Sequence, residues 1–490
     1  MSIEPSAVQV GALKERTLKV RHAVITSLAV VTPTAAIFFL TIPAAANAGK
    51  AMPFAFLVAF LAVLLIVNAI YRFTQRVAHA GSFFAFVQAG LGPRAGFVAG
   101  WLFLAFYPLV QVFSLVIFGA FVSQIVAQHA DTTIQWWVIT LIGLGCIWLL
   151  SLLGIRLSIR TDLLFLAFEV IVLGALALTI LFKGGAHGVW HPEVFSPRGV
   201  GAGGIALAVV FGIQSFTGFE AASYLGEEAQ EPRRTIPRGM IITTLIGGIV
   251  YVFFAYVATV GWGVGDMLKY GQNAAPWDVL GTRYWNSSST IVIDVAAAIA
   301  VLAGGMASQN GAARMLFALG RDGLLPRSLG HTSRRFGTPD VALTVLLGAA
   351  IAIGLGLGFH FGPIAAFSVL GLVVTFAALG VYFLAQVACT VFFWRRKEFN
   401  LLWHGLIPLA AMAVIVYLFI KSEFPTPPHP LNLAIWIAIV WALAGLLIVG
   451  AMSVIAPQRF ARMGQIIAED EPGELLVAEG ESAAAPPAPA

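Results

Sequence analysis

Two glutamates inside long apolar runs are the residues of this sequence best placed to do chemistry. Glu220 follows a polar interruption of its run and Glu169 lies near the middle of its run, whereas Asp294 lies only about five residues from the start of one. An ionisable side chain in an apolar environment is costly, and burial favours the protonated carboxyl over the carboxylate. We therefore predict that Glu220 and Glu169 bind protons. The alternative for each is a structural hydrogen bond to a neighbouring helix, and a further alternative for Glu169 is to help hold a cationic group. For Asp294 we expect a vestibule or packing role.

Two segments interrupt the apolar runs that carry them. Pro33, flanked by Thr32 and Thr34, stands in the middle of the first run, and the polar stretch from Gln214 to Glu220 lies in the sixth. A proline removes a helical hydrogen bond, and such a break persists in lipid only where protein or a water-filled cavity covers it. Breaks in corresponding helices of two halves indicate the binding site of an inverted-repeat transporter. The alternative is that Pro33 only kinks a helix.

Broken helices expose backbone groups that suit one kind of ligand. The N-terminus of a half-helix presents N–H groups that attract a carboxylate, and exposed carbonyls beside it accept an ammonium group or a small cation. A zwitterionic amino acid matches both. The residues predicted to contact substrate lie at the two breaks, with one tyrosine of the third run: Thr32, Pro33, Thr34, Ala35, Gln214, Ser215, Phe216, Thr217, Gly218 and Tyr107.

The elements that position these residues are predicted from hydropathy. Of the 490 residues, 59% are hydrophobic and 10% are charged, against about 25% charged in an ordinary soluble domain. Lipid must therefore be the solvent for most of the chain. A spanning helix needs about 20 mostly apolar residues. Twelve runs qualify, at 23–47, 53–71, 95–126, 134–154, 162–182, 204–225, 239–263, 289–317, 340–358, 363–394, 403–420 and 432–455.

The distribution of charge predicts the orientation of these helices. With the N-terminus in the cytoplasm, 22 of the 28 Lys and Arg residues fall on cytoplasmic segments, as the positive-inside rule requires. Both tails, 1–22 and 456–490, are then cytoplasmic, and the acidic, Ala/Pro-rich C-terminal tail is predicted to be disordered. Cys146 and Cys389 stand alone in apolar runs, so no disulfide framework or CxxC motif is available.

Four segments resemble the amino acid–polyamine–organocation permeases. The segment 212–236, GIQSFTGFEAASYLGEEAQEPRRTI, is similar to their sixth-helix region. Segment 78–101 resembles the motif between their second and third helices, 154–160 resembles the link between the fourth and fifth, and 310–326 resembles the exit of the eighth. The matching positions include Gly81, Gly92, Gly96, Gly100, Trp101, Glu227, Glu228, Pro232, Arg233, Arg234 and Pro237.

The resemblance implies an all-α membrane fold of twelve helices. Its ten-helix core, residues 23–394, is expected to be a LeuT-like five-plus-five inverted repeat, with repeats at 23–183 and 203–394 and with helices 1 and 6 discontinuous. Helices 11 and 12 follow in 395–455. In sodium-coupled relatives, helix-8 hydroxyls form a cation site with helix-1 carbonyls, which makes Ser308 and Asn310 candidates for such a site. Their alternative role is to hydrogen-bond neighbouring helices.

Three departures from the family pattern bear on the substrate. The helix-1 break holds Thr32-Pro33-Thr34 where many relatives have a glycine pair. Gln214 stands where relatives commonly place an aromatic gate, and Glu169 where several carry a lysine in place of sodium. A carboxylate near the position of Glu220 is linked to proton-dependent gating in the arginine–agmatine antiporter. These departures favour an amine or an unusual amino acid as substrate.

The predicted function is secondary active transport of an amino acid or related amine across the cytoplasmic membrane, by alternating access and with proton-coupled uptake. No P-loop is present, so ATP is not expected to drive it. No cofactor, metal or nucleic acid is expected, and the protein is expected to be a monomer or homodimer in the lipid bilayer. The alternatives are a polyamine or organic-amine permease or exchanger of the same fold, a membrane-embedded sensor, and a transferase.

Overall fold

The computed structural model describes most of the chain between Leu18 and Ile455. Nearly all of the predicted N-terminal tail (1–22) and the whole predicted C-terminal tail (456–490) lie outside the described residues, as do Gly81 and Glu227 of the family-like segments. The described residues are 18–77, 83–129, 132–225, 228–273, 275–321, 323, 325–424, 426 and 429–455.

The described residues contain 12 helical spans that are long and apolar enough to cross a membrane, which confirms the predicted number. Several spans are made of two helical segments in series. In chain order they are α1 (Val20–Val31) with α2 (Pro33–Phe39), α3 (Thr41–Ala48) with α4 (Met52–Thr74), α6 (Pro93–Leu104) with α7 (Tyr107–His129), α8 (Trp136–Leu153), α9 (Ile155–Phe182), α10 (Ala202–Gln214) with η3 (Phe219–Leu225), α11 (Pro232–Trp262), α14 (Thr290–Arg321), α15 (Asp340–Phe361), α16 (Pro363–Arg395), a π-helical turn (Leu401–Leu406) with α17 (Ile407–Glu423), and α18 (Leu433–Ile455).

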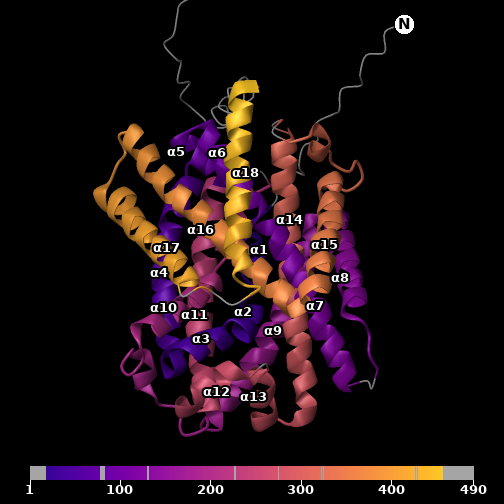
Figure 1. Cartoon of the computed structure of the whole chain (residues 1–490), viewed down its shortest axis with the longest axis vertical. Coiled ribbons are helices and arrows are strands. Elements are labelled where there is room, and N and C mark those ends of the chain that lie inside the picture. Colours follow the sequence, from indigo (N-terminus) through magenta and orange to yellow (C-terminus); the bar gives the residue numbers. More distant parts are fainter. Residues whose placement is uncertain are drawn as a thin grey trace, which may run out of the picture.

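The first apolar run is more divided than the single span predicted at 23–47. After the interruption between α1 and α2, the chain turns at Leu40 and begins α3, which precedes α4. Figure 1 shows α2 and α3 lying across the long axis of the bundle, near the short helices α12 (Met267–Gln272) and α13 (Pro276–Tyr284). The predicted division into two repeats is not tested by the number of spans and stays a prediction.

Burial separates the central helices from the peripheral ones. In the first span, α1 and α2, 67% of the residues in its most apolar stretch are buried, against 17% in α18. The helix α1 packs against α9, α11, α14 and η3, whereas α18 leaves Leu443, Leu446 and Leu447 exposed. An apolar face that the protein leaves uncovered suits contact with lipid. The broken first span therefore lies in the centre of the bundle.

A glycine of α14 lets this helix approach the interruption in the first span. A Cβ atom built on Gly304 would lie 2.3 Å from Cγ2 of Thr32, closer than real Cβ contacts allow. Small residues at helix crossings bring backbones together in membrane proteins. Gly304 thus sets the distance between α14 and Thr32.

Candidate functional site

The first break is confined to one residue. Thr32 adopts left-handed angles, φ 44° and ψ 68°, which are strained for a β-branched residue. Pro33 then opens α2 at the first helical position, where its missing N–H costs no hydrogen bond. Helical hydrogen bonding continues on both sides, because the Thr32 N–H donates to the Leu28 carbonyl (2.9 Å) and the Ala36 N–H to the Thr32 carbonyl (3.0 Å).

The second break is wider. The helix α10 ends at Gln214, and η3 begins only at Phe219. Gly218 has φ +108°, and a Cβ built on it would lie 2.4 Å from Cγ1 of Val30. Only glycine fits this backbone and this contact. Since Val30 lies two residues before Thr32, the two breaks lie against each other.

Tyr251 of α11 joins the two breaks. Its hydroxyl lies 2.6 Å from the carbonyl oxygen of Ser215 and 3.3 Å from that of Val31, and donates to both. The Ala222 N–H of η3 also donates to the Ser27 hydroxyl of α1, at 2.9 Å. Tyr251 is not among the site residues predicted from the sequence. The available signal was a tyrosine in the middle of an apolar span, because a buried phenol needs a hydrogen-bond partner.

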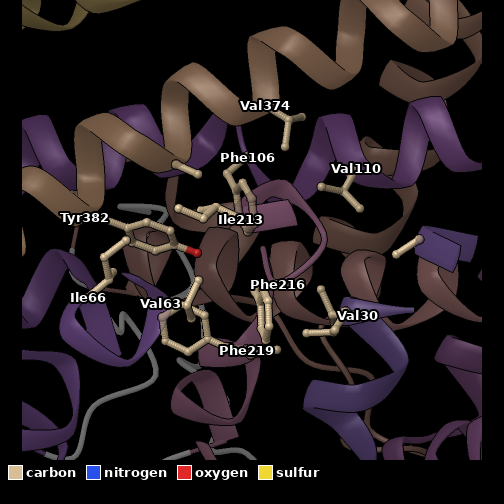
Figure 2. Packing of buried hydrophobic residues seen from close by; sticks show 14 of the residues in the cluster. Val30, Val63, Ile66, Phe106, Val110, Ile213, Phe216, Phe219, Val374 and Tyr382 are labelled. Atoms are coloured by element: carbon tan, nitrogen blue, oxygen red, sulfur yellow. The ribbon is translucent and has the colours of Figure 1, made fainter. Parts of the chain in front are cut away.

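Glu220 is fully buried in η3 and accepts hydrogen bonds from two tyrosines. Tyr382 of α16 donates to Oε2 at 2.8 Å, and Tyr107 of α7 donates to Oε1 at 3.3 Å. Figure 2 shows the hydroxyl of Tyr382 directed into the cluster that also contains Phe216 and Phe219. Two donated hydrogen bonds stabilise the carboxylate, whereas burial favours the protonated acid. Glu220 therefore links the second break to α7 and α16.

Glu169 reaches the first break from α9. It is 2% exposed and accepts a hydrogen bond from the side chain of Thr34, in the first turn of α2. Among the described residues no ion pair of Glu169 or of Glu220 occurs. Each break thus has one buried carboxyl beside it, and neither carboxyl is neutralised by a described cation.

The other predicted site residues lie at the two breaks or on α14. Thr32, Pro33, Thr34 and Ala35 lie together at the first break, and Gln214, Ser215, Thr217 and Gly218 lie together at the second. Phe216 packs between Phe60 (ring centroids 6.1 Å apart) and Tyr251 (4.9 Å). Asn310 donates to the Ser158 hydroxyl of α9 at 2.7 Å. The Ser308 hydroxyl is buried without a partner among the described residues.

Short helices cover the far end of the first span. The indole N–H of Trp277 in α13 donates to the Ile37 carbonyl of α2 at 3.1 Å, and the hydroxyls of Tyr270 in α12 and Thr41 in α3 are 2.8 Å apart. Asp278, next to Trp277, hydrogen-bonds Asp294 of α14. Burial, and then the charge and the hydrogen bond of Asp294, raise the pKa of Asp278 to about 7. This contact requires a proton, because two carboxylates have no hydrogen to donate.

An apolar groove elsewhere on the bundle does not belong to this site. It lies between α4, α10 and α17, has a volume of about 620 Å³, and is lined by residues such as Phe54, Val209 and Tyr417. Its lining includes none of the break residues. An apolar lining suits lipid chains rather than a zwitterion.

Comparison with known proteins identifies the family. A family model described as amino acid permease matches residues 21–453. A low-affinity putrescine importer of Escherichia coli (strain K12) is 24% identical over 355 residues, 71% of this chain and 75% of the relative. A branched-chain amino acid permease of Bacillus subtilis (strain 168) is 28% identical over 435 residues, which cover 84% of this chain and 88% of the relative. A gamma-aminobutyric acid permease of Escherichia coli (strain K12) is 26% identical over 347 residues, which cover 68% of this chain and 71% of the relative.

The family match begins in the first span and ends in the last, so it covers the helices that form both breaks. The chain therefore belongs to the amino acid permease family, within the amino acid–polyamine–organocation superfamily.

Proposed function

We propose that this protein is a secondary transporter that takes up an amino acid or a related amine, coupled to protons, by alternating access. The observation that carries the proposal is the pair of adjacent breaks joined by Tyr251. A bundle with interrupted helices at its centre holds polar backbone where a small polar ligand can bind. The membrane is the cytoplasmic one and both termini are cytoplasmic in this proposal, as the distribution of Lys and Arg predicts.

The substrate binds between the two breaks. The first turn of α2 carries the amides of Thr34 and Ala35, which are at positions where a helix leaves N–H groups unpaired. These amides receive the substrate carboxylate. Polar groups of the second break, among them the side-chain amide of Gln214, receive the amino group or the rest of the substrate. Branched-chain amino acids and gamma-aminobutyric acid, the substrates named for two of the relatives, carry both a carboxylate and an amino group. Putrescine carries amino groups only, so it matches the part of the site that receives the amino group.

The proton binds at Glu220 and Glu169. Glu220 accepts hydrogen bonds from Tyr382 and Tyr107, so a change in its protonation alters how the second break is held to α7 and α16. Glu169 stands in the same relation to α2 through Thr34. A carboxyl that changes charge next to a break gives the proton gradient a means to favour one arrangement of the helices over the other.

Uptake into proteoliposomes tests this function. The purified protein is reconstituted and given labelled branched-chain amino acids, gamma-aminobutyric acid and putrescine, under a proton gradient, a sodium gradient or no gradient. We expect accumulation of at least one substrate under the proton gradient only. Accumulation under the sodium gradient alone would refute proton coupling, but the proposal that the protein transports an amino acid or amine would stand. No gradient-dependent uptake of any substrate would refute the transport proposal, provided that the protein is correctly folded by size-exclusion chromatography.

A further inference from the structure

The helix α9 carries a second buried acid on the face that bears Glu169. Asp162 precedes Glu169 by seven residues, which places both side chains on one side of the helix and about 10 Å apart along its axis. Each residue is 2% exposed. Asp162 is not among the three acids predicted to lie within the spans, and it is the first residue of the run predicted at 162–182.

The surroundings of Asp162 leave it incompletely paired. One of its carboxyl oxygens, Oδ1, is buried without a hydrogen-bond partner among the described residues. One helical turn earlier, Ser158 accepts its hydrogen bond from Asn310 of α14, so this face of α9 is held against α14. Buried polar atoms in native proteins are nearly always paired. The Oδ1 atom of Asp162 is therefore available to take up a proton or to accept a hydrogen bond from water.

No described cation compensates Asp162. Arg314 of α14, one turn beyond Asn310, is 2.6 Å from Glu228 and forms a buried ion pair with it. Arg160 of α9 itself and Arg21 at the start of α1 are exposed. The Nδ1 atom of His22 on α1 accepts the N–H of Lys19. The charge that acts on Asp162 is that of Glu169, and two buried like charges disfavour simultaneous ionisation.

We propose that Asp162 and Glu169 form a two-carboxyl proton relay along α9, with Asp162 as the second proton-binding residue of the coupling mechanism. A proton leaves the carboxyl of Glu169 at the first break as the carboxylate of Asp162 accepts one. Asp162 then releases the proton toward the end of the bundle that carries the Ser158–Asn310 hydrogen bond. One O–H bond breaks and one forms in each step, and water carries the proton across the separation. The relay rests on the proposed proton-coupled transport.

The test separates substrate movement from proton coupling. Wild type, Asp162→Asn, Asp162→Glu and Asp294→Asn are reconstituted and assayed for substrate exchange without a gradient and for accumulation under a proton gradient. Asp294→Asn is the matched control, because Asp294 is also 2% exposed but belongs to the α13 contact. We expect Asp162→Asn to keep exchange and to lose accumulation by about tenfold, within the usual range of coupling between sites. Asp162→Glu restores accumulation, and Asp294→Asn resembles wild type.

Two results would overturn the relay in different ways. Asp162→Asn that accumulates substrate as wild type does, with the same pH profile, refutes the role of Asp162 and leaves proton-coupled transport standing. Wild type that exchanges substrate but does not accumulate it under a proton gradient refutes the proposed coupling and the relay with it.

An infrared measurement covers the case in which Asp162→Asn does not fold. Protein with carbon-13 in its aspartate carboxyls is prepared in the Asp278→Asn/Asp294→Asn background, because Asp278 also holds a proton, and is examined at acidic and alkaline pH beside Asp162→Glu in the same background. The relay requires a protonated-aspartate band, displaced by the isotope, that disappears as the pH rises and that Asp162→Glu lacks. An unchanged aspartate spectrum would refute the relay.

Discussion

The two breaks at the centre of the bundle are built differently although they lie in contact. The first departs from helical geometry at Thr32 alone and resumes at once, with helical hydrogen bonds on either side. In the second break the residues from Ser215 to Gly218 are not helical, and the chain then continues as a 3₁₀ segment that carries Glu220. A proline can end one helix and start the next without further loss, because the missing N–H falls where none is needed. The second break has no such device and depends on a glycine.

The difference indicates which break is the more adaptable. The first break is held at its far end by Trp277, which donates to the α2 carbonyl of Ile37. The second is held by hydrogen bonds from Tyr251, Tyr107 and Tyr382, three residues on three other helices. Side-chain hydrogen bonds, at about 0.5–1.5 kcal/mol net each, hold both breaks, but only the first break also keeps α-helical backbone hydrogen bonds on either side of its single irregular residue. We therefore expect the second break to change more during transport, and the following substitutions test the comparison.

Gly218→Val is expected to have the largest effect. The new side chain meets Val30 and also requires an unfavourable backbone angle at φ +108°, so we expect loss of uptake and a destabilisation of about 1–3 kcal/mol or more. Thermal unfolding of the purified protein and uptake measure the two effects. Gly184→Val is the control for backbone strain alone, since Gly184 has φ +86° and open space around it. Equal effects of the two variants would refute the contact between the breaks.

Tyr251→Phe is expected to rank second. It leaves the carbonyls of Ser215 and Val31 without their shared donor, which costs about 1–3 kcal/mol for buried groups. We expect a lower melting temperature and slower uptake. The control is Tyr256→Phe on the same helix, whose hydroxyl donates to the Val189 carbonyl in a loop. If Tyr256→Phe slows uptake as much as Tyr251→Phe, the bridge between the breaks has no special role.

Tyr382→Phe is expected to change the pH dependence of uptake. It removes the shorter of the two hydrogen bonds to Glu220, 2.8 Å against 3.3 Å from Tyr107. The lost donor had stabilised the carboxylate, so Glu220 keeps its proton to higher pH and the midpoint of the uptake profile moves to more alkaline pH. Tyr107→Phe is expected to move it less. A midpoint that moves to more acidic pH, or does not move in either variant, would contradict the role of Glu220.

Asp278→Asn is expected to have the smallest effect, because it changes only the contact between α13 and α14 beyond the first break. The pKa of Asp278 is raised from 3.8 to about 7, so the folded state holds a proton that the unfolded state releases. The stabilisation is complete below pH 4 and is lost as the pH rises toward 7. Wild type should thus melt at a lower temperature at pH 8 than at pH 5, and the difference should shrink in Asp278→Asn. An unchanged difference would show that α13 is held in another way.

The sequence alone was sufficient for the spans and for the location of the breaks. Twelve apolar runs were predicted and 12 spans are found, because a helix in lipid needs about 20 apolar residues whatever its neighbours are. The breaks at Pro33 and Gly218 follow from residue types whose backbone preferences are local. The family also follows from the sequence, through short segments in the right order.

The partners of these residues were decided only by the tertiary structure. Tyr251, Tyr382 and Asp162 stand far from the breaks or from each other in sequence, so no local pattern shows which groups they meet. Phe216 lies in the predicted site yet packs between two rings, because the direction of a side chain in an irregular segment depends on the helices around it. Hydrophobic runs determine which segments cross the membrane, since transfer into lipid depends on composition. Which buried polar groups meet depends on how the helices are rotated and packed, and that information is spread over the whole bundle.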